Sequence, residues 1–150
     1  MSKSLSILTI GAILICTEAL AQRKPCTQAQ NIQAEEESGN LRSWDALYNS
    51  YHSYAHCGNV SAGEGYSESI ARILVDHWNT LQRLSDLAGK DVLFRQFVVL
   101  HVDATLRLRD LKKITSNAKT RCPSRLTGLC ADLKTRADAA IKEDAALGIE

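Results

Sequence analysis

Residues 91–105, DVLFRQFVVLHVDAT, constrain the fold more than any other stretch of this chain. The segment is apolar nearly all round and holds both phenylalanines of the chain, Phe94 and Phe97. A surface helix needs a single apolar stripe, so a segment apolar on all sides is expected to be buried. A short apolar run is also typical of a buried strand, but the neighbouring segments have helical periodicity. We therefore predict a central, buried helix over residues 91–105.

The flanking segments predict further helices, because most of them place apolar residues at the spacing i, i+3, i+4 and i+7. The exception is the first, which is polar and acidic near its end. A glycine-rich stretch, residues 58–65, predicts one exposed loop, with Ser67 as the cap of the helix that follows. The fold class is therefore all-α, a compact bundle of five to six helices in one domain. The predicted flanking helices cover residues 27–38, 41–56, 66–87, 106–121 and a last segment that starts at Ser124 or Thr127 and frays beyond Ala145.

The N-terminus has the pattern of a secretory signal peptide. Lys3 provides a positive charge, residues 5–16 are apolar, and Ala19 and Ala21 form a small-x-small cleavage site. We expect cleavage after Ala21, which divides the chain into a signal peptide (residues 1–21) and a helical domain (residues 22–150). Cys16 leaves a lipoprotein as an alternative, although a bulky isoleucine precedes it. No later segment reaches the ~20 apolar residues of a membrane span, so we expect a periplasmic protein without membrane insertion after cleavage.

Four cysteines follow the expected cleavage site: Cys26, Cys57, Cys122 and Cys130. An even number in an exported chain favours two disulfides, for which three connectivities exist. If residues 27–38 and 41–56 are antiparallel helices, Cys26 and Cys57 lie at the same open end. Cys122 and Cys130 flank a turn and can close it. We therefore predict the pairs Cys26–Cys57 and Cys122–Cys130.

The charge balance supports neither of two classes of partner. The formal net charge is +1 at pH 7, with 18 basic and 17 acidic residues. A balance this close to neutral gives no electrostatic argument for nucleic acid or for anionic lipid as a partner. We expect neither kind of partner.

The sequence favours no metal and no cofactor. His52 and His56 are spaced i, i+4 on one predicted helix beside Cys57, but the HExxH pattern of zinc sites is missing and Cys57 is expected to be oxidised. Met1 is the sole methionine, and no CxxCH motif occurs. These features argue against methionine-ligated haem or copper and against covalent haem.

A catalytic constellation is equally hard to assemble. His77 and His101 with nearby carboxylates would be the residues of an enzyme or ligand-binding site, and Ser67 or Ser69 with His77 and Asp103 would form a triad. No GxSxG turn supports that triad. The ordinary interpretation is a pair of buried histidines with hydrogen-bond partners. We expect no enzyme.

A tyrosine-rich helix offers a surface for a protein partner. Residues 41–56 hold three of the four tyrosines, and an aromatic stripe is either core or contact surface. Core is the commoner fate of such a stripe. The candidate partner surface combines Tyr48 and Tyr54 with Glu64 and Tyr66 at the glycine-rich loop.

Four blocks of the chain carry a resemblance to a known family. They are RSWDALYNSYHSYAHC (residues 42–57), EGYSESIARILVDHW (64–78), FRQFVVLHVDATL (94–106) and NAKTRCPSRLTGLCADL (117–133). The chain resembles a family of small exported, all-helical proteins of Gram-negative bacteria. The resemblance implies a helical fold and a periplasmic setting, and no activity comes with it. In type alone, the chain is similar to helical immunity proteins that neutralise cell-wall amidase effectors.

Three functions follow as hypotheses. The first is a periplasmic protein-binding or inhibitor protein, such as an immunity protein against a secreted toxin, whose partner is another protein. The second is a small periplasmic enzyme or ligand-binding protein that uses His77 and His101. The third is an envelope protein with a structural or stress role.

Overall fold

A computed structural model describes residues 25–148, and the predicted signal peptide with Cys16 lies outside this range. The described chain folds into seven α-helices and no strands, with two disulfides, so the predicted all-α fold is confirmed. The helices are α1 (Gln28–Ser38), α2 (Trp44–Tyr54), α3 (Val60–Asp76), α4 (Leu81–Ala88), α5 (Val92–Leu100), α6 (Leu108–Thr120) and α7 (Thr127–Leu147), with 3-10 turns η1 (Ala55–Cys57), η2 (Trp78–Thr80) and η3 (Ser124–Leu126).

Side-chain caps begin four of these helices. The side chains of Thr27, Ser43, Asn59 and Asp91 each accept a hydrogen bond from the backbone N–H three residues later. Thr27 also forms a capping box with Gln30, so the polar α1 begins with two satisfied donors. Each cap contributes about 1 kcal/mol by satisfying a backbone N–H that the helix cannot.

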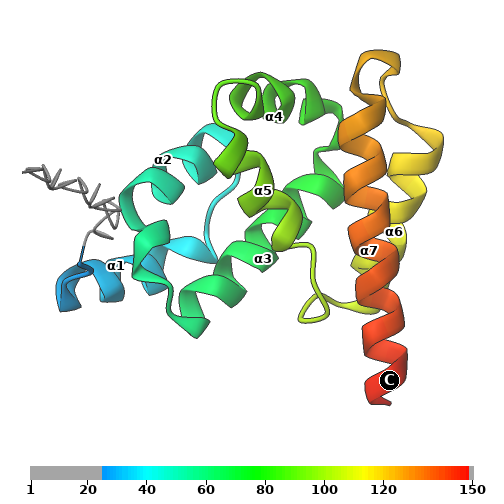
Figure 1. The fold of residues 1–150 in the computed structure, drawn as a ribbon. Coiled ribbons are helices and arrows are strands. Elements are labelled where there is room, and N and C mark those ends of the chain that lie inside the picture. Colours follow the sequence, from blue (N-terminus) through cyan, green and yellow to red (C-terminus); the bar gives the residue numbers. More distant parts are fainter. Residues whose placement is uncertain (1–24, 149–150) are drawn as a thin grey trace, which may run out of the picture.

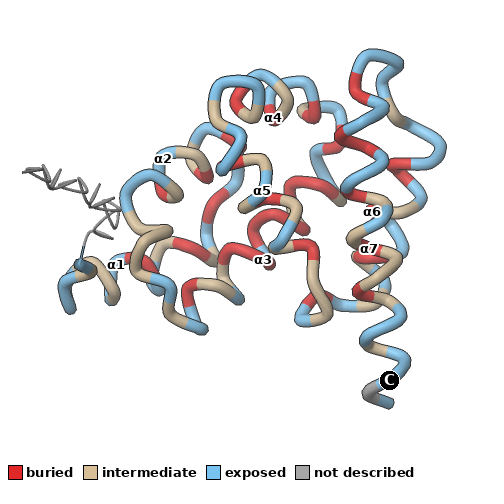
Figure 2. The backbone as a smooth tube through the Cα atoms, in the orientation of Figure 1, coloured by how far each residue is buried: buried red, intermediate tan, exposed pale blue. Residues whose placement is uncertain are grey.

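Helix α3 is the centre of the fold. It packs against α1, α2 and α6, and Figure 2 shows buried stretches along its length. Its buried residues recur with a helical period and cover more than one face. They are Ala62, Tyr66, Ser67, Ser69, Ile70, Ala71, Ile73 and Leu74.

Helices α6 and α7 form a hairpin at one side of the molecule (Figure 1) and bury Leu111, Ile114 and Leu133 completely. The Cys122–Cys130 disulfide closes the turn of this hairpin. At the other side, Cys26–Cys57 ties the start of α1 to η1. Both predicted pairings are confirmed.

The helix predicted over residues 66–87 is two helices that separate at His77. His77 has φ −124° and ψ 38°, which ends α3 before η2 begins. The break turns the buried Trp78 so that its indole Nε1 donates to the Arg121 carbonyl at 3.0 Å. This tertiary hydrogen bond accompanies a break that the local periodicity does not predict. This break raises the number of helices from the predicted five to six to seven.

The predicted loop over residues 58–65 is wrong. Only Gly58 and Asn59 lie outside a helix, because Asn59 caps α3 at Ala62 and the helix continues through both following glycines. Gly65 lies against the end of α1, where a Cβ atom would approach Ser38 Oγ to 2.2 Å. Ser67 is therefore a buried residue within α3, and the prediction that it begins a helix is also wrong.

The helix predicted over residues 91–105 is confirmed only over Val92–Leu100, and its burial on all sides is wrong. Phe94 and Val98 are fully buried, whereas Val92, Leu93 and Leu100 face solvent. The helix packs against α4 and α7, and Phe97 contacts Tyr66 of α3, so among residues 25–148 only one of its faces is covered by other helices.

None of the described helices is both long and apolar enough to cross a membrane.

Candidate protein-binding surface

The outer face of α5 is a ridge of large aliphatic side chains in contact with solvent. Val92, Leu93 and Leu100 are 62%, 61% and 62% exposed, respectively. Val92, Gln96 and Leu100 follow one line at the spacing i, i+4, i+8, with Leu93 beside it. Single exposed aliphatic residues are common, but several adjacent ones on one helix typically mark an interaction surface.

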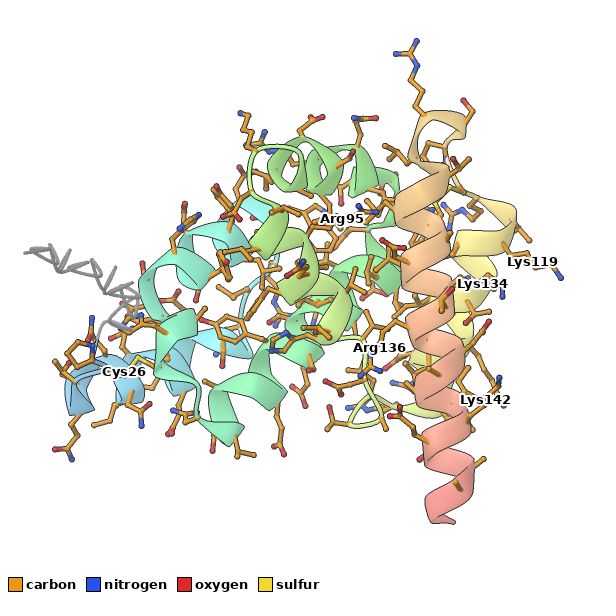
Figure 3. All side chains as sticks on the ribbon, in the orientation of Figure 1. Cys26, Arg95, Lys119, Lys134, Arg136 and Lys142 are labelled. Carbon is orange, nitrogen blue, oxygen red and sulfur yellow. A yellow bond between two sulfur atoms is a disulfide. The ribbon has the colours of Figure 1, made fainter. Side chains whose placement is uncertain are left out.

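A groove of about 390 Å³ runs along this ridge toward α7. Arg95, labelled in Figure 3, forms an ion pair with Asp132 of α7, with 2.6 Å between Nη2 and Oδ2. Both side chains stay partly exposed, at 37% and 49%. We call the ridge and this groove the α5 surface; it comprises Val92, Leu93, Arg95, Gln96, Val99, Leu100 and Asp132.

The edge toward α2 is polar and aromatic. Asp91, the cap of α5, lies 3.2 Å from His52 Nε2. The half-buried ring of Tyr48 stands edge-on to Phe94, with 4.8 Å between centroids, and to His52, with 4.4 Å. Tyr48 therefore borders the N-terminal end of the α5 surface. An apolar ridge with polar groups at both edges has the anatomy of a protein interface.

The structure does not bring the predicted partner residues together on an exposed patch. Tyr66 is 3% exposed, and its hydroxyl hydrogen bonds with Ser50 Oγ at 2.9 Å, so its predicted surface role is wrong. Burial raises the pKa of the Tyr66 hydroxyl. Tyr54 is half-buried at the end of α2, and Glu64 is exposed on α3. Tyr66 is buried because the expected loop is helix, which turns this side chain inward toward α2.

The two histidines of the enzyme hypothesis have different surroundings. His101 Nδ1 lies 2.8 Å from the Phe97 carbonyl, and its ring packs against Phe97 and Tyr66. Burial lowers the pKa of His101, an effect that the Phe97 carbonyl and Asp103 partly oppose. His77 is exposed, so the prediction that it is a buried core histidine is wrong. Of three well-defined cavities among the described residues, one is lined by His77 and none by both histidines.

The serine triad does not form. Ser67 Oγ donates to Asp103 Oδ2 at 2.9 Å, which ties α3 to the segment after α5. Ser69 Oγ donates to the Ser38 carbonyl at 2.5 Å and accepts from the Leu41 N–H at 3.2 Å. Both hydroxyls are satisfied in structural roles.

A cleft of about 430 Å³ lies between α3 and the start of α6. Three arginines, Arg72, Arg107 and Arg109, line it together with three carboxylates. Arg72 donates to the Gly39 carbonyl, and Arg109 lies 3.4 Å from Asp110. This mixture of opposite charges selects no particular class of ligand.

The α5 surface was missed because its apolar residues were interpreted as core. The signal that could have found it is the pair Arg95-Gln96, the only polar residues within the apolar run. On a helix, Gln96 lies on the line of Val92 and Leu100, so it marks the face that meets solvent.

No family model, curated protein or solved structure matches this chain. The resemblance to exported helical proteins therefore stays a prediction.

Proposed function

We propose that this protein works by binding another protein, as an exported inhibitor of the immunity-protein type that neutralises a secreted toxin. The observation that carries this proposal is the α5 surface, on which three large aliphatic side chains of one short helix remain in water. The polar groups at its edges and the groove beside it would also determine how a partner is oriented on this surface.

The energy available at the ridge is sufficient for a specific contact. Completing the burial of a Val or Leu that is three-fifths exposed contributes about 1–2 kcal/mol. Val92, Leu93 and Leu100 together therefore offer several kcal/mol, part of which offsets the entropy lost on association. We expect the binding energy to concentrate in these residues and Tyr48, as it does in the hot spots of known interfaces.

The charged groups at the edges of the α5 surface indicate which kind of partner would fit it. Arg95 and Asp132 neutralise each other at one edge, and Asp91 has His52 beside it at the other. A partner that places apolar side chains on the ridge and hydrogen-bonding groups at its rims would match this arrangement. A strongly charged partner would gain little, since the chain has a net charge of only +1.

Two features support an exported setting. The signal-peptide pattern of residues 1–21 is typical of secretion into the periplasm. Disulfides such as Cys26–Cys57 and Cys122–Cys130 persist in oxidising compartments. A periplasmic immunity protein would meet its toxin there.

The experiment compares two double variants of the full chain that each remove two exposed aliphatic side chains. Leu93→Gln/Leu100→Gln changes the α5 surface, and Ile32→Gln/Val60→Gln changes residues that are 50% and 78% exposed elsewhere. Each protein captures partners from periplasmic extract, and the affinity for the captured protein is then measured. We expect the α5 variant to bind at least ~10-fold more weakly, since 1.4 kcal/mol corresponds to tenfold. The control should bind as the wild type does.

A second assay separates inhibition from simple binding. The captured protein is tested for enzymatic or toxic activity, and wild type is titrated into it. Loss of that activity at a one-to-one ratio supports an inhibitor. A captured protein that both double variants bind equally would place the contact elsewhere, with Tyr54→Ala and Glu64→Ala as the next variants. Failure to capture any protein would favour the structural role in the envelope.

A further inference from the structure

Three potential metal ligands meet where the first disulfide closes the fold. The sulfur atoms of Cys26 and Cys57 and a ring nitrogen of His56 all lie within 4.8 Å of one another. His56 Nε2 is 3.9 Å from Cys57 Sγ. All three residues are half-buried.

Different parts of the chain bring these ligands together. Cys26, labelled in Figure 3, precedes the cap of α1, while His56 and Cys57 belong to η1. Gly58 follows with a φ of +54°, so the backbone turns sharply away after Cys57. A hydrogen bond of 2.6 Å from Asn59 Nδ2 to Asn31 Oδ1 holds the start of α3 against α1 beside the cluster. This hydrogen bond helps, together with the disulfide, to keep the ligands of α1 and η1 near one another.

We propose that reduction of the Cys26–Cys57 disulfide creates a zinc site whose ligands are Cys26 Sγ, Cys57 Sγ and His56 Nε2. A dithiol reductant supplies two electrons and two protons; its own S–S bond forms as the protein S–S bond breaks. Both protein thiols then lose their protons as Zn²⁺ binds, and His56 binds as the neutral imidazole. Water from solvent takes the fourth position.

The distances suit such a site. With bonds of about 2.3 Å to sulfur and about 2.0 Å to nitrogen, tetrahedral zinc separates two sulfurs by about 3.8 Å and sulfur from nitrogen by about 3.5 Å. The distance of 3.9 Å between His56 Nε2 and Cys57 Sγ is already close to the sulfur–nitrogen distance of about 3.5 Å. The two sulfurs need only move apart from bonding distance, which rotation of the cysteine side chains allows after reduction.

The other disulfide provides a control within the same molecule. Cys122 and Cys130 belong to no comparable group of histidine, cysteine and carboxylate ligands among residues 25–148. Reduction there should create two thiols without a third ligand. We therefore expect the Cys122/Cys130 pair to bind zinc more weakly than the Cys26/Cys57 pair.

Bound zinc would replace the Cys26–Cys57 disulfide as the link between the start of α1 and η1. Reduction frees the start of α1 from η1, while zinc bound by Cys26 and Cys57 joins the same two segments again. Because metal binding to the folded state adds to folding stability, zinc should restore the melting temperature lost on reduction. The site would let the protein keep its fold when the disulfide is lost.

The test uses the full chain after reduction by a phosphine, with Zn²⁺ alone as the probe and a chromophoric chelator as competitor. Reduced wild type and Cys122→Ser/Cys130→Ser should each bind about one Zn²⁺ and melt at a higher temperature with it. Cys26→Ser/Cys57→Ser should lose both effects. His56→Ala should bind about 100-fold more weakly or worse, because even the loss of a residue that only hydrogen bonds to a metal ligand costs about 10–100-fold.

Circular dichroism checks folding throughout, and His56→Ala is first checked with its disulfides intact. Cys16 is present in every variant, so it cannot explain a difference between them. Equal zinc affinity of wild type and His56→Ala would overturn the proposal. So would zinc binding that survives in Cys26→Ser/Cys57→Ser, or a reduced chain whose helicity zinc neither maintains nor restores.

Discussion

Gly65 and Ser38 are in such close contact that only a glycine fits between α3 and the end of α1. A Cβ atom on Gly65 would lie 2.2 Å from Ser38 Oγ and 2.8 Å from the Gly39 backbone nitrogen. Ser38 is fully buried and cannot move out of the way without cost. We expect Gly65→Ala to lower the free energy of unfolding by about 1–3 kcal/mol, the usual cost of overpacking.

Gly63 is the matched control for Gly65, two residues earlier in the same helix. A Cβ atom there would meet nothing within 4 Å. Gly63→Ala should raise the free energy of unfolding by about 0.4–1 kcal/mol, because alanine has less freedom in the unfolded chain and a higher helix propensity. Urea titration of both variants checks the two signs. Equal effects would mean that α1 and α3 are further apart than described.

Tyr66 should behave as a core residue. Its hydroxyl bonds to the buried Ser50 Oγ at 2.9 Å and also donates to the Ser50 carbonyl at 3.3 Å. Tyr66→Phe leaves Ser50 Oγ without this partner and should cost about 1–3 kcal/mol, whereas Ser50→Ala should cost less because the Tyr66 hydroxyl keeps the carbonyl. The double variant removes both groups and should cost clearly less than the sum. A double-mutant cycle from urea unfolding measures this coupling. Strict additivity would argue against the hydrogen bond.

Alanine substitutions at adjacent residues of α5 should differ sharply in how much they destabilise the protein. Phe94 is fully buried and packs against the rings of Tyr48 and Tyr51, whereas Leu93 is 61% exposed. Phe94→Ala should cost about 3–5 kcal/mol through lost burial and a cavity. Leu93→Ala should stay within about 0.5 kcal/mol, as for other surface changes. Thermal unfolding of the two variants compares them, and a large loss for Leu93→Ala would place α5 within the core.

The two disulfides should contribute unequally. Cys26 and Cys57 are 31 residues apart, while Cys122 and Cys130 are 8 apart. The entropy of loop closure assigns about 3.7 kcal/mol to the first disulfide and about 2.5 kcal/mol to the second. Cys26→Ser/Cys57→Ser should therefore unfold at the lower denaturant concentration of the two double variants. The reverse order would show that native-state contacts of the α6–α7 hairpin outweigh chain entropy.

His101 should make the fold less stable in mild acid. Burial holds its pKa below the ordinary value of 6.5, so the unfolded chain binds a proton more readily than the folded one. The free energy of unfolding should therefore decrease as the pH falls through 6.5 toward the lower folded pKa. His101→Gln should reduce this slope, and His77→Gln, a change at an exposed histidine, should keep it. Urea titrations between pH 5 and 8 test this, and a slope unchanged in His101→Gln would assign the effect to another group.

Several helices and both disulfide pairs of this protein follow from its sequence. Periodic runs such as the one over α6 depend on residues three or four positions apart, so the local chain suffices to predict them. The pairing of Cys26 with Cys57 followed from two helices joined by a short turn. In each case the residues involved are close in the sequence or joined by a short turn, so they must also lie close in space.

Only the tertiary structure decided which faces are buried and which ligands meet. Periodicity cannot tell that α3 continues through Gly63 and Gly65, because the close contact that needs Gly65 comes from Ser38, 27 residues earlier in the sequence. For the same reason, periodicity predicts neither that Leu93 is exposed nor that His56 lies close to Cys26. An apolar run indicates that its burial is favourable. Which other segments cover it depends on how distant parts of the chain pack.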